Sequence, residues 1–280
     1  MAKRDRSLPR GWYPFDRKDC ERDIESFLAG WSPPSRLSEA GTGGIVPHAG
    51  WFFSGKIAAR VLRTLSKKSV DLVVLFGGHL GPNDLPTIVL EESCETPFGD
   101  IEVHRDFAEK LARKVQLKRE STSSSDNTLE VQLPMVKFFF PDSKLLALRS
   151  PFSGAAIELG KEVGELSKRE GISIVAIGST DLTHYGPNYG FVPKGLGPSS
   201  VEWVRTQNDQ RFVLEALRMN PEALLRDAVE NYSACSAGAA ASAVATCKAL
   251  GVEKGMLLEY YTSYDILADQ SFVGYAGIVY

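Results

Sequence analysis

The fold class follows from one stretch, Asp71-Leu72-Val73-Val74-Leu75-Phe76-Gly77-Gly78-His79. Its apolar residues run without interruption, which predicts a strand that is buried on both faces, as in a parallel sheet covered by helices. Two glycines end the run, and a histidine follows them directly. The chain therefore leaves this strand through a turn that carries a polar side chain.

Runs of the same kind occur on both sides of this strand in the chain. Ile172–Ile177 predicts a second buried strand, and Gly44–Val46 predicts a shorter one. The spacing of apolar residues between the strands predicts helices, among them 54–65 and 154–170. Strands that alternate with helices indicate an α/β fold. We expect a single domain over residues 1–280, with a central mixed, largely parallel sheet flanked by helices.

Local signals predict how three of the helices begin or pack. Ser54 is expected to cap the helix that runs to about Leu65. Residues 127–130, Asn-Thr-Leu-Glu, have the spacing of a capping box, with the asparagine as the cap. The small residues of 238–249 indicate a helix that packs closely against a neighbour.

Composition excludes several classes of protein. The 280 residues carry a net charge of −3, and 43% of them are hydrophobic, which is ordinary for a globular chain. No basic face stands out, so nucleic acid is not expected as a partner. No apolar run reaches the roughly 18 residues of a membrane span, so no membrane partner is expected. The charged N-terminus and the scattered cysteines predict a cytoplasmic protein.

Histidines follow the predicted strands at equivalent points. His48 comes after the strand at 44–46, His79 after the strand at 72–76, and His184 a short way after the strand at 172–177. Ligands of open α/β sheets bind beyond the carboxyl ends of the strands, so these imidazoles and Asp181 are expected to converge there. Imidazole and carboxylate are usual ligands of Zn²⁺, Fe²⁺ and Cu²⁺. Each histidine alone also fits a loop or core position, and we expect His104 at the surface.

Two further features fit the same site. Asp181 and His184 would share one face of a helical turn, as two ligands or as a carboxylate that orients an acid or base. A plain helix cap at Thr180 or Asp181 is the alternative. Cys235 lies just before a predicted helix, where a thiol has a lowered pKa and can act as nucleophile or metal ligand. An inert buried cysteine is the alternative there.

Several motifs together resemble the MEMO family. Residues 47–55, PHAGWFFSG, resemble that family's PHAGYxYSG segment, and residues 179–186, STDLTHYG, resemble its SSDLSHYG segment. The further matches, in chain order, are Gly11–Pro14, Gly77–His79, Leu129–Pro134, Cys235 with Gly238, Thr262–Asp265 and Val273–Ala276. The matches keep the family's order and span nearly the whole chain.

The resemblance implies a fold similar to the class III extradiol dioxygenases, which are non-haem iron enzymes. His48, His79 and Cys235 match the family's metal-ligand set, and Asp181 and His184 match its remaining cleft residues. The implied cofactor is a divalent metal, with Fe²⁺ expected first and Cu or Zn as alternatives. Relatives are also associated with a radical-SAM protein, which is the implied functional partner.

The chain departs from the family at two places. Asn127 stands where relatives usually have a histidine, and an asparagine cannot serve as an acid or base near neutral pH. The residues around His79, from Gly78 to Asp84, lack the second histidine that some relatives carry. We therefore expect any chemistry that needs those histidines to be altered or absent in this chain.

Three functions agree with these residues. The first is a redox enzyme in which His48, His79 and Cys235 bind iron or copper, and His184 acts as acid or base with Asp181 orienting it. The second is a binding module, since the resemblance implies phosphotyrosine-peptide binding as an alternative use of the cleft. A peptide or another anionic ligand would then lie against Trp12, Trp51 and Asn127. The third is a zinc hydrolase, since two histidines and one cysteine also form a catalytic zinc set.

Overall fold

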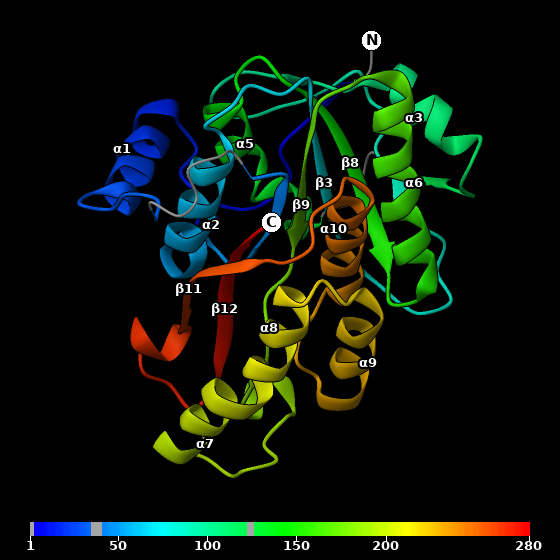
Figure 1. The fold of residues 1–280 in the computed structure, drawn as a ribbon. Coiled ribbons are helices and arrows are strands. Elements are labelled where there is room, and N and C mark those ends of the chain that lie inside the picture. The colour runs from blue at the N-terminus through cyan, green and yellow to red at the C-terminus, as the bar shows by residue number, and fades with distance from the viewer. Residues whose placement is uncertain (1–2, 35–40, 122–125) are drawn as a thin grey trace.

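The structure, a computed structural model, describes residues 3–34, 41–121 and 126–280. Parallel strands form the middle of the main sheet (Figure 1). Their order in space is β2 (Gly43–Val46), β9 (Ile174–Ser179), β3 (Leu72–Leu80) and β8 (Lys144–Pro151). The predicted strand at 72–76 therefore lies inside the sheet, between two parallel neighbours.

Antiparallel strands border this parallel centre. β12 (Phe272–Val279) pairs with β2, and β4 (Thr87–Ile88) pairs with β8. The other strands of the sheet are β10 (His184–Tyr185) and β11 (Met256–Thr262), both antiparallel to β12, and β7 (Lys118–Arg119), parallel to β4. A separate small sheet contains β1 (Lys3–Arg4), β5 (Ser93–Cys94) and β6 (Ile101–Glu102). The structure confirms the predicted α/β domain with a mixed, centrally parallel sheet.

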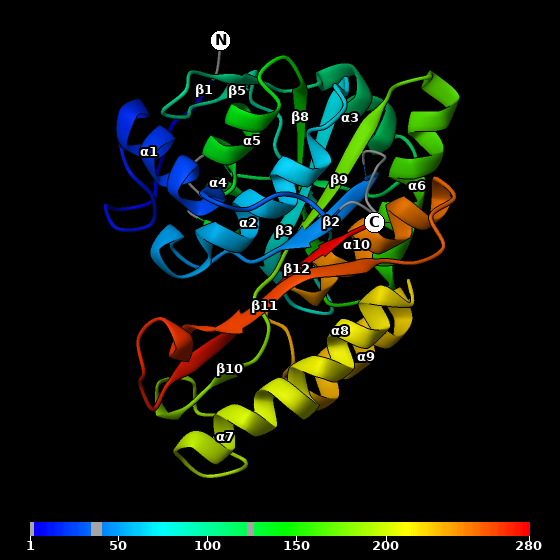
Figure 2. The same ribbon diagram turned by 60° about the vertical axis from the view of Figure 1, so that its left-hand side comes forward.

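Helices cover both faces of the sheet, as Figures 1 and 2 show. One face carries α1 (Arg17–Leu28), α2 (Trp51–Leu65), α4 (Asn127–Glu130) and α5 (Leu133–Phe139). The other carries α3 (Arg105–Ala112), α6 (Gly154–Glu170), α8 (Asp209–Leu217), α9 (Pro221–Asn231) and α10 (Ala237–Ala249). The remaining helical segments are α7 (Pro198–Trp203), the π-helix Val204–Asn208 that joins it to α8, and the 3₁₀ turns Pro187–Tyr189 and Ser263–Asp265. Within the described ranges, no helix combines the length and apolar character that crossing a membrane requires.

The two layers explain why the run in β3 is apolar throughout. Leu72, Val74 and Phe76 belong to the core under α6 and α10. Val73 and Leu75 alternate with them and belong to the core under α2. Both sets are fully buried, because side chains of a strand point alternately to the two faces and each face is covered.

Close packing of α10 against β8 and α6 fixes the position of the residues just before this helix. A Cβ atom at Gly238 would collide with the carbonyl oxygens of Ser150 and Pro151, at the carboxyl end of β8. A Cβ atom at Gly160 of α6 would likewise collide with the backbone of Ser242 in α10. The small residues therefore let the helix lie directly on its neighbours, as the sequence predicts. The start of α10, just after Cys235, is held at the carboxyl end of the sheet.

Both predicted helix caps are wrong in detail. α2 begins at Trp51, and the hydroxyl of Ser54 lies inside the helix, where it donates to the carbonyl of Ala49 at 2.9 Å. At α4 the cap is Asp126, whose carboxylate accepts from the backbone N–H of Thr128 at 2.9 Å. The cap thus lies one residue earlier than predicted, and the Asn127 side chain is not used as a cap.

Candidate metal centre

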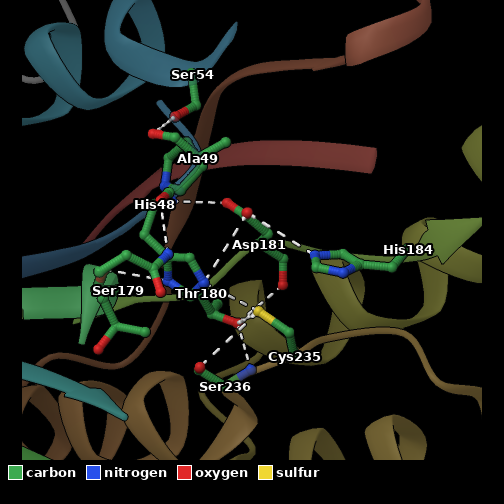
Figure 3. Close-up of polar contacts among 12 residues, drawn as sticks. His48, Ala49, Ser54, Ser179, Thr180, Asp181, His184, Cys235 and Ser236 are labelled. Carbon is green, nitrogen blue, oxygen red and sulfur yellow. Dashed lines mark hydrogen bonds and ion pairs between the residues drawn. The ribbon is translucent and has the colours of Figure 1, made fainter. Parts of the chain in front are cut away.

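The predicted ligands come from the carboxyl ends of adjacent parallel strands. His48 lies just after β2 and Asp181 lies just after β9. His79 is the last residue but one of β3. Cys235 comes from the segment between α9 and α10, whose backbone is hydrogen-bonded to Asp181 just after β9. The convergence that the sequence predicts for the strand ends is what the geometry shows (Figure 3).

The side chains of His48, His79 and Cys235 form a set of donors with the size of a metal site. One donor atom from each lies within 4.8 Å of the others. The Cys235 Sγ is 3.1 Å from the His48 Nε2, and the rings of the two histidines stand at 90° with centroids 5.1 Å apart. Metal–ligand bonds of about 2.0–2.3 Å fit donor atoms at this spacing. His48 is buried and His79 is exposed, so the set is open on one side.

Hydrogen bonds hold His48 with its Nε2 toward the thiol. Its backbone N–H donates to the Asp181 carboxylate at 2.7 Å, and its Nδ1 lies 3.4 Å from the Ser179 hydroxyl. The side chain of Gln132 donates to the carbonyl of Pro47 at 2.7 Å and so fixes the preceding residue. A hydrogen bond at one ring nitrogen orients the other toward a ligand, which is typical of histidines that bind metals.

The backbone also fixes Cys235. Its N–H donates to the carbonyl of Asp181 at 3.2 Å, and the N–H of Ser236 donates to the hydroxyl of Thr180 at 3.0 Å. From the sequence Thr180 is expected only as a helix cap, and no local pattern marks Ser236. Both contacts join segments about fifty residues apart in the chain, and no local pattern predicts such a pair.

Asp181 lies between two histidines. Its Oδ2 is 3.9 Å from the His48 Nε2 and 3.8 Å from the His184 Nε2 (Figure 3). The predicted helical turn is wrong, because residues 180–183 follow β9 without helical structure and His184 begins β10, where it pairs with Val273. The two side chains still meet, and the described residues offer the buried His184 Nε2 no hydrogen-bond partner.

The charges of the cluster change the pKa values of Cys235, His48 and His184. Burial alone would raise the pKa of the Cys235 thiol, but His48, His184 and His79 outweigh it and lower that pKa well below its usual range. Burial lowers the pKa of His48, and the charges of Cys235 and Asp181 overcome this and raise it to about 9. For His184 burial is likewise overcome, by Asp181 and Cys235, and the pKa rises to about 10. The cluster is therefore a thiolate among charged imidazoles, which supplies an anionic sulfur ligand.

A carboxylate that the sequence analysis missed stands behind His79. The Asp126 Oδ2 is 3.9 Å from the His79 Nδ1 and 2.9 Å from a guanidinium nitrogen of Arg149. Gly78 precedes the histidine with a φ of +97°, and a Cβ atom there would collide with Arg149. The glycine therefore allows the turn that brings His79 to the site. The capping pattern at Asp126–Asn127 is the only local signal here, and it indicates a helix start rather than the contact of Asp126 with His79.

A cavity of about 450 Å³ opens above the cluster. Trp12 and Asn127 line it together with the histidines and Asp181. The Asn127 amide donates to the carbonyl of His48 at 3.2 Å, so it supports this candidate ligand as well as lining the cavity. Trp51 is buried elsewhere: its indole N–H donates to the carbonyl of Val131 at 3.1 Å, and it borders a neighbouring hollow with Trp12. Contact of Trp51 with a substrate stays a prediction.

Comparison with known proteins places these residues in a family. A sequence model described as "Memo-like protein" matches residues 4–279. A "MEMO1 family protein" of Nitrosopumilus maritimus is 31% identical, with 95% of each chain covered. One of Methanopyrus kandleri is 30% identical, with 96% of this chain and 95% of the relative covered. An uncharacterized protein of Escherichia coli K12 has a similar fold, with a TM-score of 0.50 and 13% identity over 78% of this chain and 91% of that one. This chain belongs to the Memo-like protein family.

Proposed function

We propose that the protein is a metal-dependent redox protein that binds iron or copper through His48, His79 and Cys235. The observation that carries this proposal is the set of three donor atoms within 4.8 Å, one of them a thiolate, beside an open cavity. Two imidazoles and one anionic ligand with open positions resemble the donor set of non-haem iron oxygenases, with sulfur in place of carboxylate. A bound metal of this kind would supply electron transfer between a substrate and dioxygen.

The other residues of the cavity have roles in binding and proton transfer. His184 lines the cavity, and its Nε2 faces Asp181, so it can hold a proton and deliver it to a bound substrate. Asp181 keeps that imidazole charged and oriented. Asn127 occupies the place of the family's histidine and can donate a hydrogen bond but no proton. Proton transfer therefore depends on His184.

The anion-binding alternative has less support from the cavity. Anionic peptide groups are usually held by arginines, in pairs of charge-assisted hydrogen bonds. Among the described residues that line the cavity there is no lysine or arginine, and Asp181 and Asp269 offset the positive charge of the His48 and His184 imidazoles. Zinc stays a second candidate, since the same donors suit it and a hydrolase would use the metal's water. Association with a radical-SAM protein and a cytoplasmic location stay proposals from the sequence.

The test is metal loading of protein purified without chelator. Under anaerobic, reducing conditions we expect uptake of about one Fe²⁺ or Cu⁺ per chain, and oxygen consumption when air and a reducing substrate are admitted. Cys235→Ala should lower the metal affinity by at least roughly 100-fold, since an inner ligand matters more than the outer partners that cost 10–100-fold.

The matched control is His104→Ala. His104 caps α3, where its Nδ1 accepts from the N–H of Phe107 at 3.3 Å, away from the centre. This variant should bind metal as the wild type does. Failure of the wild-type protein to take up iron or copper would overturn the proposal, and uptake of zinc alone would favour the hydrolase.

A further inference from the structure

A second cavity adjoins the metal centre. It has a volume of about 580 Å³, which is within the range of sites for small organic ligands. Cys235 forms part of its wall, and His184 and Tyr189 belong to the walls of both cavities. The two cavities therefore meet at the candidate acid–base group, His184, and the candidate ligand Cys235 faces the second one.

The walls of this second cavity, called the apolar chamber here, are apolar and aromatic. They include Leu80 from the end of β3, Phe152 after β8, Phe191, and Val229 from α9. Among the described residues that line the chamber there is no lysine, arginine, aspartate or glutamate. Away from the wall that holds Cys235 and His184, a charged group would lose its hydration without gaining a partner, whereas an alkyl or aryl group would lose only contact with water.

The walls of the chamber are fixed by the core and by ring contacts. Leu182, Ala228 and Ala234 are buried in its floor, within the main core. The rings of Phe191 and Tyr232 lie 5.3 Å apart, and those of His184 and Tyr189 lie 4.9 Å apart. At the rim, Val229 and Tyr232 are 60% and 68% exposed. Apolar surface is therefore exposed to solvent beside the opening. A ligand that entered would cover it.

We propose that the apolar chamber binds the alkyl or aryl end of a small organic substrate whose polar end reaches the metal centre. The assignment of the polar end rests on the proposed function. The assignment of the apolar end rests on the chamber alone. Cys235 lies in the wall of the chamber, and its sulfur is 3.1 Å from His48, which lines the other cavity, so the two ends of such a molecule would lie on either side of the thiol and His184.

The thiol of Cys235 is a reporter that tests the chamber without any metal. The other cysteines, Cys20, Cys94 and Cys247, are buried, and Cys235 is half-buried. Metal-free protein would be treated with N-methyl-, N-ethyl- and N-butylmaleimide, and the adduct would be located by mass spectrometry. Each thiolate adds across the maleimide double bond, and water supplies the proton. Glutathione, which has no chamber, gives the reference rate for every reagent.

The expected result is a rate that rises with the length of the alkyl group. Each buried methylene is worth up to about a fourfold gain in binding, so N-butylmaleimide should exceed N-methylmaleimide by at least about tenfold after correction by glutathione. Val229→Glu puts a charge at the rim and should cut this ratio severalfold. Leu214→Glu is the matched control, because Leu214 is also an exposed apolar residue of a helix and lines neither cavity. It should leave the ratio unchanged.

Metal loading separates the two proposals. Iron or copper bound to Cys235 should slow alkylation by every maleimide alike. A steep dependence on alkyl length without metal protection supports the chamber and contradicts the metal centre. Metal protection with a corrected ratio near one overturns the chamber and leaves the metal centre standing. A ratio that Val229→Glu does not change would also overturn the chamber, since the gain would then come from another surface.

Discussion

Cys235 is the candidate ligand that no strand end supplies, and its place depends on contacts across the chain. Its sulfur lies 3.1 Å from His48, while its backbone is bonded to Asp181 and its neighbour to Thr180. The thiolate and the imidazoles stabilise each other's charges in the metal-free protein. A metal ion bound at this site would have to replace the proton of His48, so the same contacts that favour the thiolate would also make metal binding dependent on pH.

The sign of that dependence follows from His48. Its pKa of about 9 means that it is protonated at neutral pH, and metal binding must release that proton. Metal affinity should therefore rise with pH, by up to about tenfold per unit from this group, until about pH 9. Calorimetry in buffers of different ionisation enthalpy would count the protons released. Affinity that stays constant between pH 6.5 and 9 would exclude His48 as a ligand.

Residue positions were predictable where a strand end places them and not elsewhere. His48, His79 and Asp181 follow apolar runs, and the run alone tells which edge of the sheet they reach. For Cys235 the position before a helix fits a metal ligand and an inert buried cysteine equally, and only the family resemblance favours the ligand. Asp126 was missed because its contact with His79 depends on the turn at Gly78, which is a property of the folded backbone.

At the scale of elements, the chain leaving β9 is held by α8. The Asp209 carboxylate accepts from the backbone N–H of Thr183 at 3.0 Å and from the Tyr260 hydroxyl at 2.7 Å. Thr183 directly precedes His184. This contact therefore holds the chain extended into β10 and prevents a helical turn there. The predicted helical turn failed because its residues find partners in α8 and β12, far away in the chain.

The same reason explains the failed capping box. The Glu130 carboxylate accepts from the backbone N–H groups of Ser7 and Leu8 at 2.9 Å, and from the Tyr13 hydroxyl at 3.0 Å. These partners lie more than one hundred residues away in the chain. Local patterns thus predicted the existence of α4 and α2, whereas the use of each polar side chain depended on tertiary contacts.

Asp209 predicts a dependence of stability on pH. Burial raises its pKa to about 7, against the hydrogen bonds of Thr183 and Tyr260, which lower it. The folded chain then binds this proton more tightly than the unfolded chain, whose carboxyl has a pKa near 3.9. The stabilisation from the bound proton is therefore complete below about pH 4 and is lost as the pH rises through 7.

Asp209→Asn keeps an acceptor for Thr183 and removes the ionisable group. Relative to this variant, the free energy of unfolding of the wild type should fall by up to about 4 kcal/mol between pH 4 and 8, since one pKa unit corresponds to about 1.4 kcal/mol. Urea unfolding of both proteins across that range gives the difference. Parallel curves would show that Asp209 is ionised at acid pH in the folded protein.

In the whole molecule, helices cover both faces of the sheet, and the candidate ligands gather at one edge of it. His48 and His79 come from strands under α2 and α10, and Cys235 comes from the approach to α10. This architecture was predictable because apolar runs and helical spacing are properties of the sequence itself. The cavities were not, since the apolar chamber needs side chains from β3, α9 and the loop at 189–191 to meet.

A metal ion at the centre joins segments that enter from different layers of the fold, so it should stabilise the whole molecule. An ion that binds the folded chain alone adds about 2.7 kcal/mol when its concentration is 100 times the dissociation constant. For a chain of this length that corresponds to a rise in Tm of roughly 5 °C. Anaerobic thermal unfolding with increasing Fe²⁺, followed by chelator, measures the rise and its reversal. Cys235→Ala should show little of it, because two imidazoles alone hold the ion weakly. An equal rise in that variant would place the stabilising ion at another site and remove the link between the centre and the fold.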